Sequence, residues 1–165
     1  MTVNLASTKG KKAKTVLSLD DLVPMTVNEL DELYLESQAP ALAKVSGPYE
    51  GRVLAGPFFP LNNIPFIKAL NGSGLVPWKG KAFNPTSETQ ANGKNRLEMG
   101  PLKTTIYPFN SFVEASIFGG ADCYVLDYDL PENPPFIRPI RDEMKEVGKD
   151  LYLGRANFKW NDEFH

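Results

Sequence analysis

The clearest periodic pattern in the chain is a stripe of apolar residues at helical spacing between residues 26 and 38. Acidic residues occupy the opposite face, as in a helix that packs one side against a core. Thr26 and Glu29 match the capping box, in which a hydroxyl and an acid three residues later satisfy backbone groups at a helix start. Pro40 ends the pattern. The chain therefore predicts one N-terminal α-helix over residues 26–38.

Beyond this helix the apolar residues form short runs that Gly, Pro and Asn interrupt. These runs predict strands at residues 49–55, 76–84, 96–99, 102–107, 111–118, 123–128 and 151–160. A hairpin turn is expected at Gln90–Gly93, which contains the Asn-Gly pair favoured in tight hairpins. Residues 137–147 are broken by Pro and are at best amphipathic, and residues 58–70 predict a short helix or lid. Many short strands at close spacing indicate an antiparallel barrel or sandwich.

Length and composition narrow the class of protein. The 165 residues fit one domain, which we place at residues 16–165, after a basic tail at 1–15 that is expected to be disordered. The tail's lysines could contact nucleic acid or anionic lipid, but they lack interleaved aromatic residues and arginines, so we expect no nucleic-acid partner. No apolar run approaches the roughly 20 residues of a membrane-spanning helix, and no signal-peptide pattern is visible. We therefore expect a cytoplasmic protein that is not integral to a membrane.

The chain has one histidine, His165, at its last position, and one cysteine, Cys123. Nucleophilic sites of the Ser-His-Asp or Cys-His type, and zinc sites built from His and Cys, cannot be assembled from these residues within one chain. We expect no metal and no cofactor. Any acid–base chemistry must then come from carboxylates, Tyr, Lys, Arg and backbone groups. Cys123 has no partner base and is expected to be a small buried residue.

Two segments combine glycine with an aromatic residue. Gly47-Pro-Tyr-Glu-Gly51 enters one predicted strand, and Pro77-Trp-Lys-Gly-Lys-Ala-Phe83 forms another. Glycines that flank an aromatic residue let a strand curve and let the ring close one end of a barrel. Three further segments follow in order, and they are Leu126–Asp129, Ile140–Glu143 and Leu151–Arg155.

The order of these segments resembles the GXWXG-type family of small, largely uncharacterised bacterial proteins. That family has an N-terminal Gly-x-Trp-x-Gly, a middle Trp-x-Gly-Lys-x-Phe, and a C-terminal series of Tyr-Asp, Asp-x-Phe-Arg and Leu-x-Gly. The resemblance spans residues 45–160. Tyr49 stands where the family has Trp, and Arg-Asp-Glu at 141–143 differs from the family's Asp-x-Phe-Arg. The resemblance implies a lipocalin-related (calycin) fold, so we expect a mainly β protein, a lipocalin-like antiparallel β-barrel with an N-terminal α-helix.

The resemblance also implies how the barrel closes. Calycin barrels commonly pack a Trp or Tyr at the closed end, under an Arg from the last strand. Arg155 is therefore expected to stack on Tyr49 or Trp78. In the alternative interpretation, Tyr49 and Trp78 line a ligand pocket.

Alternation along the predicted strand at 123–128 suggests a catalytic hypothesis. Asp127 shares a face with Val125, and a carboxylate there could sit inside the barrel. Asp127 would then act as a general acid or base, with Tyr128 or Arg141 holding the substrate. The alternative is a salt bridge that ties Asp127 to the 137–147 segment.

Other polar and aromatic residues are candidates for lining a ligand pocket. These candidates are Tyr49, Arg52, Trp78, Lys81, Arg96, Phe112, Ser116 and Arg155. Lys81 or Arg96 could pair with an inward carboxylate, and Asn95-Arg96 could reach the barrel mouth. Ser116 has no histidine to activate it, so a serine nucleophile is not expected. The run Arg141–Glu143 could be a catalytic cluster or a solvated turn.

We expect a barrel that binds a small, mostly apolar molecule. The alternative is a cofactor-free lyase, isomerase or cyclase that uses Asp, Tyr and Arg in the same pocket. A third hypothesis is a protein-interaction module whose Phe58-Phe59 and Ile64–Ile67 patch binds a partner. A buried ionisable residue with a shifted pKa would favour the enzyme, and a filled barrel with an exposed apolar patch would favour the interaction module. Neither the ligand nor the oligomeric state follows from the sequence.

Overall fold

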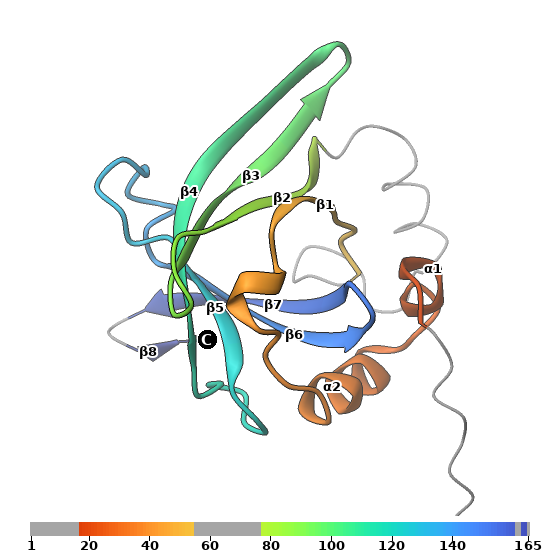
Figure 1. Ribbon diagram of the computed structural model, residues 1–165. Helices are drawn as coiled ribbons and strands as arrows, with labels where there is room; N and C mark the ends of the chain where they lie inside the picture. The colour runs from red at the N-terminus through yellow and green to blue at the C-terminus, as the bar shows by residue number, and fades with distance from the viewer. Residues whose placement is uncertain (1–16, 55–76, 161–162, 165) are drawn as a thin grey trace, which may run out of the picture.

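The computed structural model describes residues 17–54, 77–160 and 163–164. The expected basic tail at 1–15, the expected lid at 58–70 and the apolar patch within it lie outside the described residues. Within them the protein is mainly β, and its antiparallel strands form a curled half-barrel with short helices beside it (Figure 1). The mainly β, lipocalin-like fold class expected from the sequence is confirmed.

The sheet is a simple meander, because each strand pairs antiparallel with the strands before and after it in the sequence. Its strands are β1 (Gly47–Glu50), β2 (Trp78–Pro85), β3 (Ala91–Met99), β4 (Leu102–Glu114), β5 (Cys123–Asp127), β6 (Ile140–Gly148), β7 (Leu151–Trp160) and β8 (Glu163–Phe164). The curl of the sheet brings distant strands together. The rings of Tyr49 in β1 and Tyr152 in β7 meet edge to face, with centroids 5.3 Å apart. Side chains from β1 to β7 therefore share one interior.

The hairpin turn expected at Gln90–Gly93 is wrong, because Gly93 lies inside β3 and pairs with Phe83 and Phe109. The turn between β2 and β3 instead precedes Ala91, where the Thr86 N–H donates to the Gln90 carbonyl at 3.0 Å. A Cβ at position 93 would lie only 2.4 Å from the Ala82 carbonyl oxygen and 2.4 Å from the Phe109 ring. Glycine is needed here because a backbone carbonyl and an aromatic ring lie against the strand, and not because the chain turns.

The second correction concerns residues 137–147, for which the sequence predicted no strand. Residues Ile140–Gly148 form β6, which pairs with β5 and β7 in the middle of the sheet. The loop before β6 is anchored by Asn133, whose side-chain N–H groups donate to the carbonyls of Pro108 at 2.7 Å and Tyr128 at 2.8 Å. This anchor fixes the end of β5, from which the Tyr128 side chain projects.

The N-terminal helix is present and shorter than expected. The helices are α1 (Leu19–Leu22), α2 (Val27–Leu35) and the short 3-10 helix η1 (Leu42–Lys44). The capping box of α2 is confirmed, with the Thr26 N–H donating to Glu29 Oε2 at 2.7 Å and the Glu29 N–H donating to Thr26 Oγ1 at 3.3 Å. In the described ranges, no helix is long and apolar enough to cross a membrane.

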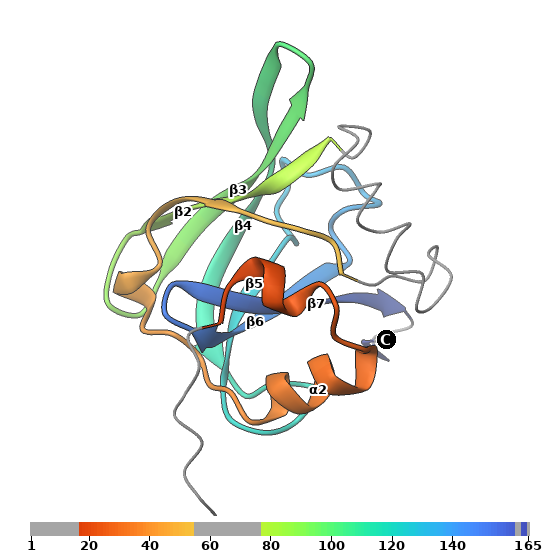
Figure 2. The same ribbon diagram turned by 90° about the vertical axis from the view of Figure 1, so that its right-hand side faces the viewer.

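Apolar side chains form two separate cores, one on each face of the curled sheet. The inner core contains Leu42, Val45, Phe83, Ala91, Phe109, Tyr124, Leu126, Tyr128 and Met144. The outer core lies between α1, α2 and the strands β6 and β7, and contains Leu22, Leu30, Tyr34, Val147, Leu151 and Leu153 (Figure 2). Both faces of β6 and β7 are thus covered in this region, which is why the sequence of β6 lacks the simple alternation of a half-buried strand.

Candidate functional site

Five side chains from four parts of the sheet meet inside the half-barrel and form what we call the inner polar cluster. They are Trp78 and Lys81 of β2, Asn95 of β3, Tyr128 at the end of β5, and Asp142 of β6. Residues of the inner core surround them, because Phe109 and Tyr128 belong to that core. Leu42 and Val45 cover the end of the half-barrel where β1 begins and β2 ends. The inner polar cluster lies toward the other end of the half-barrel.

Lys81 is the centre of the cluster. Its Nζ donates to Asn95 Oδ1 at 3.1 Å, to Asp142 Oδ2 at 2.8 Å, and to the Tyr128 hydroxyl. The same ammonium lies 5.4 Å from the ring centroid of Phe109 and 5.1 Å from that of Tyr128. An ammonium within about 6 Å of an aromatic centroid is attracted by the ring's negative face.

Asn95 holds the cluster in register with β3 and β4. Its Oδ1 accepts the indole N–H of Trp78 at 2.9 Å. Its Nδ2 donates to the Tyr128 hydroxyl at 3.0 Å and to the Tyr107 carbonyl at 3.3 Å. Tyr107 has a φ of 52° and is the extra residue where the register between β3 and β4 shifts. The bulge places a strained backbone carbonyl against the site, as bulges beside functional sites often do.

Burial and pairing set the charges of the cluster. Burial by itself would lower the pKa of Lys81, but the negative charge of Asp142 and the hydrogen bonds to Asp142 and Tyr128 outweigh it, and the pKa is raised. Lys81 is therefore an ammonium ion at neutral pH. Burial raises the pKa of Tyr128 to about 12, so the phenol keeps its proton. The cluster is an ion pair joined by a neutral phenol that can donate a proton or a hydrogen bond.

The structure corrects the expected position of Asp127. The inner core takes Tyr124, Leu126 and Tyr128 from β5, so Asp127 alternates to the outer face and does not enter the barrel. Its carboxylate accepts the Asp129 N–H at 3.0 Å, in place of the salt bridge to residues 137–147 that was the alternative. The inward carboxylate is that of Asp142, which was seen only as part of the Arg141–Glu143 run. That run is part of strand β6, in which Arg141 and Asp142 are half-buried and Glu143 is buried, so its interpretation as a solvated turn is wrong.

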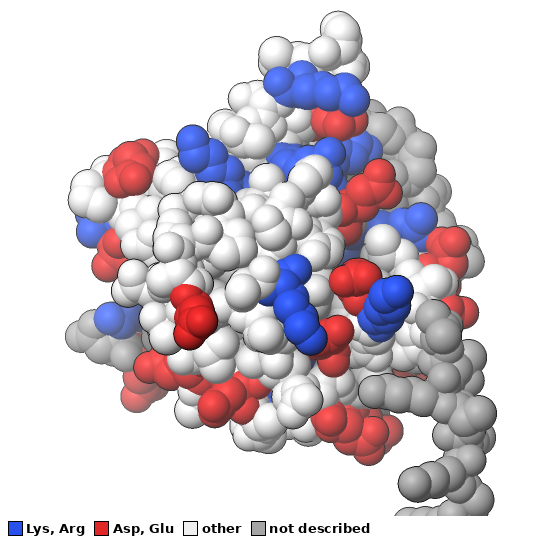
Figure 3. Space-filling model, in the orientation of Figure 1, with Lys and Arg blue, Asp and Glu red and all other residues white. Residues whose placement is uncertain are grey.

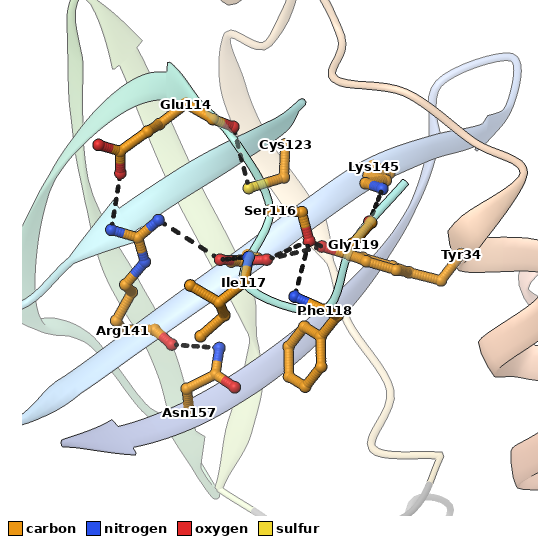
Figure 4. A network of polar contacts seen from close by, with 11 residues as sticks. Tyr34, Glu114, Ser116, Ile117, Phe118, Gly119, Cys123, Arg141, Lys145 and Asn157 are labelled. Carbon is orange, nitrogen blue, oxygen red and sulfur yellow. Dashed lines mark hydrogen bonds and ion pairs between the residues drawn. The ribbon is translucent and has the colours of Figure 1, made fainter. Parts of the chain in front are cut away.

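Arg141 and Ser116 belong to a second polar group on the outer face, which we call the outer polar network (Figure 4). Its centre is Glu143, which is fully buried. Glu143 Oε2 accepts the hydroxyls of Ser116 at 2.7 Å and Tyr34 at 3.1 Å. Glu143 Oε1 accepts the Ile117 N–H at 3.1 Å and a guanidinium N–H of Arg141 at 3.4 Å. Both carboxylate oxygens are therefore fully paired.

Two further ionisable side chains lie in the outer polar network. Lys145 is fully buried, donates to the Gly119 carbonyl at 3.1 Å, and lies 4.5 Å from the ring centroid of Tyr34. Burial lowers the pKa of Lys145 and raises the pKa of Cys123 to about 12. Burial would raise the pKa of Glu143, but the hydrogen bonds it accepts outweigh that effect and the pKa is lowered. Cys123 is the small buried residue that the sequence predicted.

Arg155 does not stack on Tyr49 or Trp78. It pairs with Glu143 in the register between β6 and β7 and therefore faces outward. Its guanidinium lies 3.7 Å from the ring centroid of Phe118 and donates to Asp31 Oδ1 at 2.8 Å. Arg155 thus connects β7 to helix α2.

In the part of the chain that the structure describes, the remaining candidate residues form no side-chain hydrogen bond with the inner polar cluster, although Tyr49 pairs with Lys81 in the register between β1 and β2. Arg52 forms an ion pair with Asp20. Arg96 donates to the carbonyl of Tyr49 at 3.0 Å. The Tyr49 ring packs in the inner core, with its centroid 5.8 Å from that of Phe83. Phe112 pairs with Val125 and shares its outward face. Of the residues singled out by sequence, Trp78, Lys81 and Tyr128 are brought together by the fold.

A depression of about 190 Å³ lies beside β1, β2 and β3. It is lined by Glu50, Gly51, Arg52, Trp78, Lys79, Arg96 and Glu98. Only Trp78 belongs both to this depression and to the inner polar cluster. Its six-membered ring lies where a Cβ on Gly51 would be, and its indole N–H points to Asn95. The depression therefore lies beside the cluster and does not contain its ionised groups.

Comparison with known proteins gives no relative for this chain. No family model, no curated protein and no solved structure matches it. Within the described ranges, no group of three His, Cys, Asp or Glu side chains is placed to hold a metal ion. The site must therefore be interpreted from its own geometry.

Asn95 and Asp142 were not recognised in the sequence as partners of Lys81. Asn95 was expected only to reach the barrel mouth, and Asp142 was grouped with its two charged neighbours. The alternation of β5 held part of the signal, because Tyr124, Leu126 and Tyr128 are the larger and more aromatic set and therefore favour the inner face. Placing Asp142 inside also requires the register between β5 and β6, in which it pairs with Leu126, and no strand was predicted at 137–147.

Proposed function

We propose that this protein binds a small, mostly apolar molecule in the half-barrel, with the inner polar cluster contacting the molecule's polar group. The observation that carries this proposal is the ion pair between Lys81 and Asp142, whose side chains are only 18% and 16% exposed within an aromatic interior. A buried ion pair commonly stabilises a fold less than well-packed apolar residues would. Buried, charge-paired groups with shifted pKa values are also typical of functional sites.

The packing of the interior limits where such a molecule can lie. Near η1 the space is occupied by aromatic rings, with the Phe83 centroid 5.5 Å from that of Phe109 and 5.8 Å from that of Tyr124. Rings at these distances are in edge-to-face contact and leave no room between them. We therefore expect the ligand to bind at the end of the half-barrel farthest from η1, next to Lys81 and Tyr128.

A second candidate function is cofactor-free acid–base catalysis in the same place, as a lyase, isomerase or cyclase. Tyr128 favours it, because its pKa of about 12 keeps the phenol protonated while its hydroxyl is close to Lys81 and 3.3 Å from Asp142 Oδ2. A neutral phenol beside an ammonium ion can donate a proton to a substrate oxygen, and the carboxylate can accept one. In this version Asp142 takes the role that the sequence suggested for Asp127.

We also propose that the protein belongs to the GXWXG-type family and is cytoplasmic. The support is the order of the glycine and aromatic motifs and the composition of the chain.

Native mass spectrometry of the protein purified from its own host, followed by organic extraction, tests the binding proposal. We expect a co-purifying small apolar molecule. The double variant Lys81→Met/Asp142→Leu should retain less of it, whereas Lys94→Met, an exposed change on β3 beside Asn95, should retain it in full. An empty protein that instead carries a second polypeptide would overturn the proposal in favour of a protein-interaction module.

Turnover separates the two candidate functions. If the extracted molecule is converted by the wild-type protein and not by Tyr128→Phe, which keeps the ring and removes the hydroxyl, the protein is an enzyme. If both proteins bind it unchanged, the protein is a carrier.

A further inference from the structure

The hydrogen-bonding capacity of the inner polar cluster is almost completely used within the cluster. Lys81 Nζ has three N–H donors, and they go to Asn95 Oδ1, Tyr128 and Asp142 Oδ2. The two N–H donors of Asn95 go to Tyr107 and Tyr128. The Tyr128 hydroxyl accepts two of these bonds and donates its own proton to Asp142 Oδ2 at 3.3 Å.

One atom of the cluster is left over. Asp142 Oδ1 is buried, and none of the residues that the structure describes donates a hydrogen bond to it. A buried acceptor without a donor costs about 1 to 3 kcal/mol, and more when it carries charge. The cluster therefore has one open hydrogen-bonding position, and that position is an acceptor. Because Oδ1 is buried, a ligand that pairs with it must displace the side chains that now cover it.

The free donors and acceptors of the cluster determine which polar groups of a ligand it can bind. An anionic group would have no free donor on Lys81 and would face the negative charge of Asp142. A hydroxyl or N–H group would supply the missing donor to Oδ1 and would leave every other bond of the cluster in place. Lys81 pairs with an inward carboxylate, as the sequence allowed, and that carboxylate belongs to Asp142.

We propose that the ligand presents a neutral hydroxyl or N–H donor to Asp142 Oδ1, and that the site discriminates against carboxylates and against ethers of the same shape. This inference rests on the proposed binding function. It adds the polar group that the otherwise apolar molecule must carry.

Fluorescence titration with three probes of one ring system tests the inference. The probes are β-naphthol, its methyl ether and β-naphthoate, which differ in whether they offer a donor, an acceptor or an anion. In the wild-type protein we expect the naphthol to bind about tenfold or more tightly than the ether, since only the naphthol pairs with the buried acceptor. The naphthoate should bind most weakly.

The variant Asp142→Asn keeps a side chain of nearly the same shape and changes the open position from an acceptor to a donor. Lys81 and Tyr128 both donate to Oδ2, so the amide must turn its oxygen toward them and place its NH2 group where Oδ1 was. The open position then becomes a donor, and the preference for naphthol over its ether should disappear or reverse. Lys94→Met should keep the wild-type preference, and circular dichroism of each variant confirms that it is folded.

The outcomes separate this inference from the proposed function. Equal affinity for naphthol and ether in the wild-type protein would overturn the inference and leave ligand binding intact; a resident water that already satisfies Oδ1 would give this result. Tightest binding of the naphthoate would also overturn it. If no probe binds and the native protein yields no extractable molecule, the proposed function fails as well. The wild-type comparison decides the matter even if Asp142→Asn does not fold.

Discussion

The inner polar cluster and the outer polar network are built from similar groups and differ in how completely their carboxylates are paired. Each has a carboxylate on β6, a lysine and a tyrosine hydroxyl, and the two carboxylates, Asp142 and Glu143, are neighbours in sequence. Glu143 is fully buried and accepts hydrogen bonds on both oxygens. Asp142 accepts bonds on one oxygen only. A network whose donors and acceptors are all paired stabilises the fold, whereas a network with an unpaired acceptor can also bind a ligand.

The two regions also connect different parts of the fold. The outer polar network ties helix α2, through Tyr34, to β6 and to the segment that contains Ser116. The inner polar cluster ties β2 and β3 to β5 and β6 across the half-barrel, where no backbone pairing between the described strands joins them. The fold should depend strongly on Glu143, because its loss leaves buried groups without an acceptor. It should depend weakly on the Lys81–Asp142 pair, because apolar residues can often replace both members of a buried ion pair at little cost. On the face drawn in Figure 3, exposed basic side chains lie mainly in the upper part, by the β3–β4 hairpin, whereas acidic ones are spread over the face and continue along the lower rim.

The largest expected effect is that of Glu143→Ala. It leaves two hydroxyls, a backbone N–H and the guanidinium of Arg141 without their shared acceptor in a buried place, and should lower the free energy of unfolding by about 3 to 5 kcal/mol. Urea denaturation measures the change. The control is Glu114→Gln, which weakens the ion pair between Glu114 and Arg141. The Glu114 side chain is 54% exposed, so this change should lower the free energy of unfolding by less than about 1 kcal/mol. Equal losses in the two variants would contradict the structural role of Glu143.

A smaller effect is the acid dependence of stability. The folded pKa of Glu143 lies below its ordinary value of 4.5, so its stabilisation is fully present above that value and is lost as pH falls through the lowered folded pKa. Tyr34 and Cys123 have raised pKa values and stay neutral in this range, and Arg141 and Lys145 stay charged. The unfolding free energy, followed by denaturation over an acidic pH series, should fall less steeply in Glu143→Gln than in the wild-type protein.

Thr26→Ala tests whether α2 itself contributes to the outer polar network. The change removes the capping box that orders the start of the helix and should cost about 1 kcal/mol. Thr89→Ala, an exposed change in the turn between β2 and β3, should alter stability by less than about 0.5 kcal/mol. Thermal and urea unfolding of both variants give the comparison. A loss no larger than that of the control would mean that α2 is held by its apolar face alone.

The smallest expected effect on stability is that of Lys81→Met/Asp142→Leu. Replacing a buried ion pair by apolar residues of similar size is often neutral, and Asn95 still pairs with Trp78 and Tyr128, so we expect a change within about 1 kcal/mol. Ligand retention should fall in the same variant. The single variant Lys81→Met, which leaves the Asp142 charge without its partner, should be less stable than the double variant. A double variant that unfolds would show that the inner polar cluster is also structural.

Local sequence signals predicted the bounds of two elements. The capping box marked the start of α2 correctly because Thr26 and Glu29 satisfy groups within one helical turn. The last long strand was predicted at 151–160 and is β7 (Leu151–Trp160), since a turn precedes it and its pattern is uninterrupted. The helix start depends on local contacts alone, whereas β7 also requires β6 as its partner, and the sequence did not predict that strand.

The misplaced residues have different causes. Gly93 was taken for a turn glycine because the groups that require it, the Ala82 carbonyl and the Phe109 ring, lie on the neighbouring strands. Asp127 was placed inside because alternation divides a strand into two faces without saying which one is inner. Arg155 was expected at the barrel's end from the family resemblance and not from its own strand. Here both faces of β5 are buried, so burial along the strand gave no means of choosing.

By itself, the sequence determined the mainly β class and the N-terminal helix, and it singled out Trp78, Lys81 and Tyr128, which the fold brings together. The tertiary structure decided which carboxylate meets Lys81. Asp142 and Glu143 are adjacent in sequence and chemically alike, and the pleat of β6 sends one into the half-barrel and the other under helix α2. That choice follows from the register between β5 and β6, where Leu126 pairs with Asp142, and register is set by the packing of the whole sheet.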